Sequence, residues 1–233
     1  MLDKLRSYLS NFSHLLYPRN CEGCGTDVLN EQDILCLKCL HQLPETGFCT
    51  NANNPVEKTF YGRLNIAAAG TAYYFTKDSL LQHLMFQLKY RNNKEVGFYL
   101  GKQLGHLLQN TERFSDVDVL VPLPLNPKKE MKRGYNQAAV ICEGISSVWE
   151  KPVLNEVVVR TSFTDTQTKQ DRVHRWQNMQ NVFAVTDKNA IDGKHILLVD
   201  DVITTGATLE ACGAVILNAS AAKLSIAALA WTI

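Results

Sequence analysis

The sequence has no long hydrophobic run, no excess of charge of either sign, no internal repeat and no low-complexity segment. No apolar stretch approaches the roughly 20 residues that a helix needs to span a bilayer, so we expect no membrane insertion. The first twenty residues lack an uninterrupted apolar core and a small-residue cleavage site, which argues against a signal peptide and favours a cytoplasmic location. The formal net charge of +1 gives no general reason to expect a nucleic acid or a membrane surface as the partner.

Cysteine, by contrast, is concentrated near the N-terminus. Four cysteines form two C-x-x-C pairs separated by eleven residues, namely Cys21, Cys24, Cys36 and Cys39. Two such knuckles can point four thiolates at one ion, which is zinc-ribbon spacing. A disulfide framework is disfavoured in a reducing compartment, and a redox pair would need only one C-x-x-C. We therefore predict a structural Zn²⁺ with no open coordination position, and Cys49 is expected to be a spare thiol.

The N-terminal region is acidic rather than basic. Residues 1–60 carry seven acidic and five basic side chains, a net charge of −2. A module that reads a phosphate backbone should be basic, so this charge disfavours a zinc ribbon that clamps DNA. The polar segment 50–62 contains Pro55 and Gly62 and is predicted to be a linker. We divide the chain into an N-terminal helix and four-cysteine module over residues 1–55 and a second domain over residues 56–233.

The second domain shows strand and helix patterns in alternation. We expect strands near residues 65–75, 117–121, 157–160, 196–199 and 224–231. Helices are expected over 78–90, behind Asp78 as a cap, and over 97–109, 135–149 and from about residue 208. Alternation of this kind predicts an α/β fold with a parallel sheet, preceded by the small cysteine module.

The run HILLVDDVITTGATLEACG, residues 195–213, is the most informative part of the chain. A short buried strand ends in Asp200 and Asp201, at the edge of a parallel sheet where ligands bind. The small residues and hydroxyls of 204–208 then lead into a helix, whose N-terminal amides suit a phosphate. An acid pair after a strand is also found as a helix cap or in receiver domains, but those would place it near the start of a domain. We predict a sugar-phosphate site.

A basic segment follows another predicted strand. Residues 128–133 contain four basic side chains and one acid, a net charge of +3, and the sequence enters a predicted helix at Gly134. We interpret this segment as a loop whose lysines and arginine bind pyrophosphate. A solvated basic surface loop is the alternative, and the position after a strand end favours a ligand loop.

These motifs resemble two nested families. The acid pair with its TTGAT loop resembles the 5-phosphoribosyl-1-pyrophosphate (PRPP) signature of type I phosphoribosyltransferases. The string VPLPLNPKKEMKRGYNQA, together with LKYRNN at 88–93 and the four cysteines, resembles the ComF/GntX family, phosphoribosyltransferase-like proteins with a zinc ribbon that are associated with DNA uptake in competent bacteria. A third pattern comprises Arg160, Thr164, Gln167, Arg175, Trp176 and Asn178, where Gln170 stands in place of a usual leucine.

The resemblance implies a type I phosphoribosyltransferase fold and a set of site residues. Asp200 and Asp201 would hold the ribose hydroxyls and act in catalysis, with Mg²⁺ bound alongside PRPP. The other expected PRPP-binding residues are Pro122, Leu123, Lys128, Arg133, Asn136, Gln137, Gln167, Val202, Thr204, Thr205, Gly206, Ala207 and Thr208. We also expect the segment from Thr161 to Asn181 to be a lid over bound PRPP. The alternative is a surface segment packed permanently by Trp176 and Phe183.

Two functions follow from this set. The first is a glycosyltransferase that moves the phosphoribosyl group of PRPP to an acceptor that no pattern names. The second is a PRPP-binding accessory factor without turnover, acting in DNA uptake with a DNA translocase and single-stranded DNA machinery, as the family resemblance implies. A zinc-ribbon nucleic-acid binder is a third function, disfavoured by the acidic N-terminal region.

Overall fold

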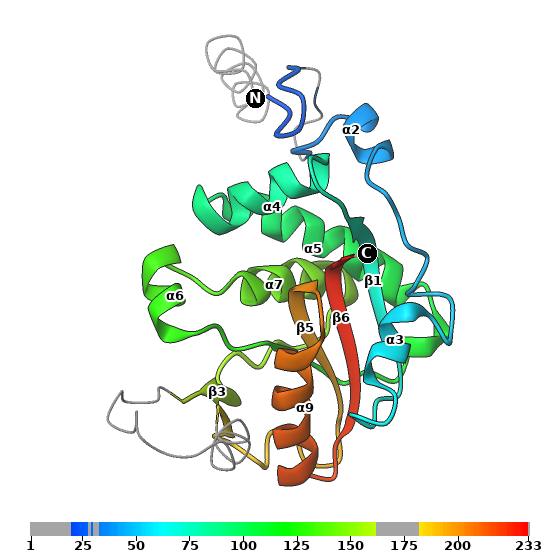
Figure 1. Cartoon of the computed structure of the whole chain (residues 1–233), viewed down its shortest axis with the longest axis vertical. Helices are drawn as coiled ribbons and strands as arrows, with labels where there is room; N and C mark the ends of the chain where they lie inside the picture. The colour runs from blue at the N-terminus through cyan, green and yellow to red at the C-terminus, as the bar shows by residue number, and fades with distance from the viewer. Residues whose placement is uncertain (1–19, 28, 30–32, 162–181, 233) are drawn as a thin grey trace, which may run out of the picture.

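A four-stranded parallel sheet forms the centre of the computed structural model, which describes residues 20–27, 29, 33–161 and 182–232 (Figure 1). The strand order is β1-β6-β5-β2. The strands are β1 (Ala69–Phe75), β2 (Val119–Pro122), β5 (His195–Ile203) and β6 (Lys223–Thr232). Residues 195–199 of β5 are all buried, because this strand is paired on both sides and covered on both faces. The predicted parallel α/β fold is confirmed.

Helices cover both faces of the sheet and create two cores. Helices α4 (Leu80–Tyr90), α5 (Lys94–Gln109) and α7 (Gln137–Trp149) pack on one face, and α3 (Pro55–Phe60) and α9 (Ala207–Ala219) on the other. Alternate residues of β5 enter the two cores: Leu197 and Val199 face the α4 side, and Ile196 and Leu198 face the α9 side. None of the helices in the described residues is long and apolar enough to cross a membrane.

Helices α5 and α7 approach each other backbone to backbone. A Cβ added at Gly144 of α7 would press on the carbonyl oxygen of Phe98, and one added at Gly101 of α5 would press on the carbonyl oxygen of Ile141. The contact therefore needs glycine at both positions, because backbone atoms cannot turn aside as a flexible side chain can.

The cysteine segment, the described residues between 20 and 41, packs against helices α4 and α5. It includes helix α2 (Leu37–His41), and Cys21, Leu35 and Cys39 belong to the same core as α4 and α5. In Figure 1 the segment lies beside α4, and the Gln87 Nε2 of that helix donates a hydrogen bond to the Glu22 carbonyl oxygen at 3.0 Å. The division of the chain between residues 55 and 56 stays a prediction.

The prediction that residues 50–62 form a linker was wrong. They contain α3, which begins with Asn54 as the cap and Pro55 in the first turn and buries Val56 and Phe60 completely. The Glu57 carboxylate pairs with Arg113, which lies in the 3₁₀-helix η1 (Glu112–Phe114). A cap followed by proline is a helix-start signal, so the polar composition of this segment was misleading.

Three further predictions need correction. The basic segment 128–133 is a helix, α6 (Pro127–Arg133), and Gly134 ends it with a φ of 81° rather than beginning the next helix. Helix α4 is capped by Ser79, whose side chain accepts a hydrogen bond from the Gln82 amide, and not by Asp78. The expected strand at 157–160 is β3 (Val158–Arg160), which pairs antiparallel with β4 (Phe183–Val185) in a separate two-stranded sheet.

Candidate functional site

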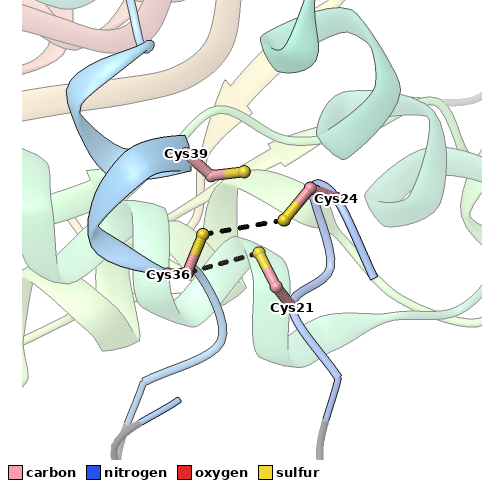
Figure 2. A group of neighbouring side chains, drawn as sticks. All are labelled: Cys21, Cys24, Cys36 and Cys39. Carbon is pink, nitrogen blue, oxygen red and sulfur yellow. Dashed lines mark hydrogen bonds between the residues drawn. The ribbon is translucent and has the colours of Figure 1, made fainter. Parts of the chain in front are cut away.

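The four predicted metal-ligand cysteines come together in one cluster, shown in Figure 2. Their sulfur atoms all lie within 4.8 Å of one another. Four sulfurs held at about 2.3 Å from a tetrahedral ion would lie about 3.8 Å apart, and the Cys24 and Cys36 sulfurs are 3.6 Å apart. Gly23 makes the first knuckle possible, because an added Cβ would lie 2.8 Å from the Cys39 sulfur. The cluster can hold a metal ion.

The backbone around the cluster favours the thiolate of Cys21, whereas burial and the neighbouring cysteines raise the pKa of Cys39. The Cys21 sulfur accepts hydrogen bonds from the amides of Cys36 at 3.2 Å and Gly23 at 3.4 Å. Burial alone would raise the pKa of Cys21, but these backbone donors outweigh it and lower the pKa to about 6. Cys49 lies outside the cluster, and burial raises the pKa of its thiol to about 12. All seven cysteines are free thiols, so the structure has no disulfide framework.

The acid pair lies within β5 rather than after it. The strand continues to Ile203, and its pairing with β6 includes Asp200 opposite Ala228. The Asp200 Oδ1 accepts a hydrogen bond from the Asp201 amide at 2.7 Å, and the Asp201 Oδ2 lies 2.8 Å from the Lys89 Nζ of α4. Burial, and then the negative charge of Asp201, raise the pKa of Asp200 to about 7. Asp201 is thus paired with a cation, whereas ionisation of Asp200 costs free energy.

A pocket of about 190 Å³ opens over the acid pair at the carboxyl edge of the sheet. It joins acidic, basic and hydroxyl side chains from five elements or their connecting loops. The predicted residues that line it are Leu123, Arg133, Asn136, Gln137, Asp200, Asp201 and Thr208. Lys129 of the predicted basic segment and Arg160 of the third sequence pattern also line it. Sequence reasoning gave no site role to the other lining residues, Lys89, Pro124, Leu125 and Ala138. Lys89 belongs to the LKYRNN motif, which was the signal that could have identified it.

The remaining predicted residues lie around this pocket or outside the described residues. Val202, Thr204, Thr205, Gly206 and Ala207 form the end of β5 and its turn into α9. Pro122 lines a neighbouring pocket of about 490 Å³, and Lys128 lies in the first turn of α6. Gln167, with the rest of the expected lid except Thr161, falls outside the described residues.

The turn before α9 leaves the helix N-terminus open. Gly206 has a φ of 71° and provides no side-chain cap. An added Cβ there would meet the Phe60 ring at 2.9 Å, so the turn fits closely against α3. Arg63 donates to the Thr205 carbonyl oxygen at 3.2 Å and pairs with Glu210 in the first turn of α9. This arrangement holds the turn. The Ala207 amide donates to the Thr205 Oγ1 at 3.4 Å, so an anion would have to be bound by the following amides of the first turn.

A second polar cluster lies at the opposite edge of the sheet. The His195 Nε2 is 2.8 Å from the Ser225 hydroxyl, and the Nδ1 is 2.9 Å from the Asp116 carboxylate. This order of groups resembles a hydrolase triad, but Ser225 is completely buried and no substrate reaches it. Burial lowers the pKa of His195, and the cluster is a structural contact that joins β5, β6 and the Asp116–Lys223 ion pair.

The raised pKa of Asp200 makes a testable prediction about stability. The ionised carboxyl opposes folding, and this cost grows as the pH rises from about 4, the unfolded-state pKa, through about 7. We expect the stability of Asp200→Asn relative to the wild type to rise by about 1–2 kcal/mol between pH 4.5 and pH 8, since solvent screens part of the effect at this partly exposed carboxyl. Urea unfolding at the two pH values measures the difference. An equal difference at both would contradict it.

Comparison with known proteins gives one family match and several relatives. Residues 129–231 match the phosphoribosyl transferase domain family. Competence protein F of Haemophilus influenzae is 26% identical over 205 residues, which are 82% of this chain and 87% of that protein. The DNA utilization protein YhgH of Escherichia coli K12 is 29% identical over 156 residues, 66% of this chain and 68% of that protein. Competence protein ComFC of Bacillus subtilis is 34% identical over 92 residues, 40% of this chain and 35% of that protein.

Among solved structures, the glutamine PRPP amidotransferase of B. subtilis aligns with a TM-score of 0.42 and 17% identity. The alignment covers 60% of this chain and 30% of the amidotransferase.

Proposed function

Because this chain is a homologue of competence protein F, ComFC and YhgH with a phosphoribosyltransferase domain, we propose that it binds PRPP and transfers the phosphoribosyl group to an acceptor, releasing pyrophosphate. One observation carries this proposal. The acid pair, the basic side chains of α6 and the N-terminus of α9 surround the pocket of about 190 Å³. PRPP has a diol, a pyrophosphate and a 5′-phosphate that call for those three kinds of group.

The acid pair supplies the negative charge of the site. Asp200 and Asp201 accept hydrogen bonds from the ribose hydroxyls and favour the positive charge that develops at the anomeric carbon. Their carboxylate oxygens are also the donor set that suits a hard cation such as Mg²⁺. When bound with PRPP, Mg²⁺ would supply charge that stabilises the departing pyrophosphate.

The two phosphate-bearing ends of PRPP lie on opposite sides of the acid pair. Lys129 and Arg133 of α6 line the pocket and bind pyrophosphate, with Arg133 held by a hydrogen bond of 2.6 Å to the Gln137 Oε1. The open N-terminus of α9 binds the 5′-phosphate through its amides and the Thr208 hydroxyl. Asn136 has a supporting role, because its side chain caps α7 and donates to the Leu123 carbonyl oxygen at 3.0 Å.

We propose Zn²⁺ as the ion of the cysteine cluster. Four thiols within 4.8 Å provide a closed tetrahedral set with no open position, so the ion is structural. The expected cytoplasmic location would suit such a site, since oxidising compartments favour disulfides over zinc-bound thiolates. Residues 1–55 would then form the zinc module and residues 56–233 the phosphoribosyltransferase domain.

Turnover is tested by incubating the full chain with Mg-PRPP and a panel of nucleobase, amine and protein acceptors while pyrophosphate release is followed. Release that depends on one acceptor supports the transferase. Tight PRPP binding without release by any acceptor supports the second candidate, a non-catalytic accessory factor for DNA uptake that works with a translocase and single-stranded DNA machinery. The names of the relatives, competence protein and DNA utilization protein, favour that candidate. No binding of PRPP would contradict both.

Asp201→Asn is expected to weaken PRPP binding by about tenfold to a hundredfold. A charge-assisted hydrogen bond contributes about 1.5–3 kcal/mol, and the amide can replace only part of it. Isothermal titration calorimetry of Mg-PRPP measures the loss. Asp78→Asn is the matched control, because Asp78 lies at the far end of α4 with a φ of 57°, a conformation that asparagine accepts. Equal affinities for Asp201→Asn and the wild type would remove the acid pair from the site.

A further inference from the structure

Lys89 reaches the acid pair from the helix that covers it. It is the penultimate residue of α4, and its Nζ lies 2.8 Å from the Asp201 Oδ2. The two side chains are only 22% and 15% exposed, so their charges interact more strongly than those of a surface pair. Among the described residues, no other cation lies within ion-pair distance of either acid.

Lys89 also borders a second pocket of about 350 Å³. This pocket adjoins the first, because Lys89, Lys129 and Arg133 line both. The second pocket contains four basic side chains and no acid; its lining residues are Lys89, Tyr90, Asn92, Lys129, Lys132 and Arg133. Lys89 therefore stands between an acidic region and a basic one.

The end of α4 is fixed while the lysine side chain is not. The Leu88 carbonyl oxygen accepts a hydrogen bond from the buried Tyr135 hydroxyl, and Gln87 bonds to the cysteine segment and to Asn93. The last turn of the helix is thus held by the two residues that precede Lys89. A lysine has four rotatable methylene groups, so its ammonium can move by several ångströms without displacing the helix.

We propose that Lys89 exchanges partners during binding. In the ligand-free protein it neutralises Asp201. When PRPP binds, its ammonium moves to the pyrophosphate in the basic pocket and leaves the Asp201 carboxylate to the ribose and to a divalent cation. This inference rests on the proposed function and adds a regulatory role for one residue: Lys89 prevents a cation from binding before the pyrophosphate does. The Lys89 Nζ lies 2.8 Å from the Asp201 Oδ2. A divalent cation that bound the same oxygen would be strongly repelled by this ammonium.

The exchange predicts opposite effects on two simple probes. Lys89→Gln should bind Mn²⁺ alone about tenfold more tightly than the wild type, because Asp201 loses its competing cation. The same variant should bind pyrophosphate alone about tenfold more weakly, because one charged donor is lost. Electron paramagnetic resonance of free Mn²⁺ and calorimetry with pyrophosphate, both at pH 8, measure the two affinities.

Two further variants separate this role from others. Lys89→Arg keeps the positive charge, so its Mn²⁺ affinity should stay near the wild-type value. This variant can be measured even if Lys89→Gln folds poorly. Lys102→Gln, on α5 and outside both pockets, should change neither affinity. Unchanged Mn²⁺ affinity in Lys89→Gln, with PRPP still bound by the wild type, would overturn the exchange and leave the proposed function intact. Failure of the wild type to bind PRPP or pyrophosphate would overturn both.

Discussion

Cys39→Ser is expected to abolish zinc binding and to unfold the cysteine module. Zinc sites of this type contribute about 10–16 kcal/mol of apparent binding free energy to folding, more than a small module can recover from its own core. Cys39 is 2% exposed and lies in the core that α4 and α5 also form. Loss of the site should therefore lower the melting temperature of the whole chain.

Metal analysis and thermal unfolding measure this effect together. Cys49→Ser is the matched control: Cys49 is equally buried, lies outside the cluster, and is 3.8 Å from the Thr71 carbonyl oxygen, which can accept a hydrogen bond from a serine hydroxyl. The control should keep one zinc and most of its stability. Wild-type protein that contains no zinc after reduced, chelator-free preparation would refute the assignment.

Gly144→Val is expected to destabilise the protein by about 3 kcal/mol or more, or to prevent folding. The added side chain would press on the carbonyl oxygen of Phe98 in α5, and relief requires the two helices to separate. Separation would open the core in which Leu104 of α5 and Ile145 of α7 are completely buried.

Urea unfolding of Gly144→Val against Glu143→Val tests the close helix approach. Glu143 is the preceding residue of α7 and is exposed, so valine there costs only a few tenths of a kcal/mol of helix propensity. A loss of less than about 1 kcal/mol for Gly144→Val relative to this control would show that α5 and α7 do not need their present spacing.

The sequence predicted those parts of the structure that are local. Strand β5, the acid pair and α9 follow one another within 25 residues, and their order was readable from the apolar run, the acids and the small residues. Four cysteines at fixed spacing likewise predicted a cluster, and their sulfur atoms lie within 4.8 Å of one another. The strand order β1-β6-β5-β2 was not predictable, because it depends on pairing between segments far apart in the sequence, such as Ala69 with Ile226 and Val119 with Ile196.

The errors arose where the composition of a segment was considered without the residues that cap a helix. The pairs Asn54-Pro55 and Asn126-Pro127 both begin short helices, yet polarity and charge suggested a linker and a loop. Lys89 was missed for a different reason. It belongs to the LKYRNN motif, but the motif gave the lysine no role, and only the packing of α4 over β5 brings it to Asp201.

Helix α6 carries much of the basic charge and buries none of its seven residues. A helix of that length has little stability of its own, and burial against the described residues adds little to it. Its amides should therefore exchange with solvent through local opening, at a free energy far below that of global unfolding. An anion that binds Lys129 and Arg133 must restrict this motion, so the entropy lost in ordering α6 offsets part of the electrostatic gain. The affinity of the chain for pyrophosphate is accordingly set by the freedom of this helix as well as by its charge.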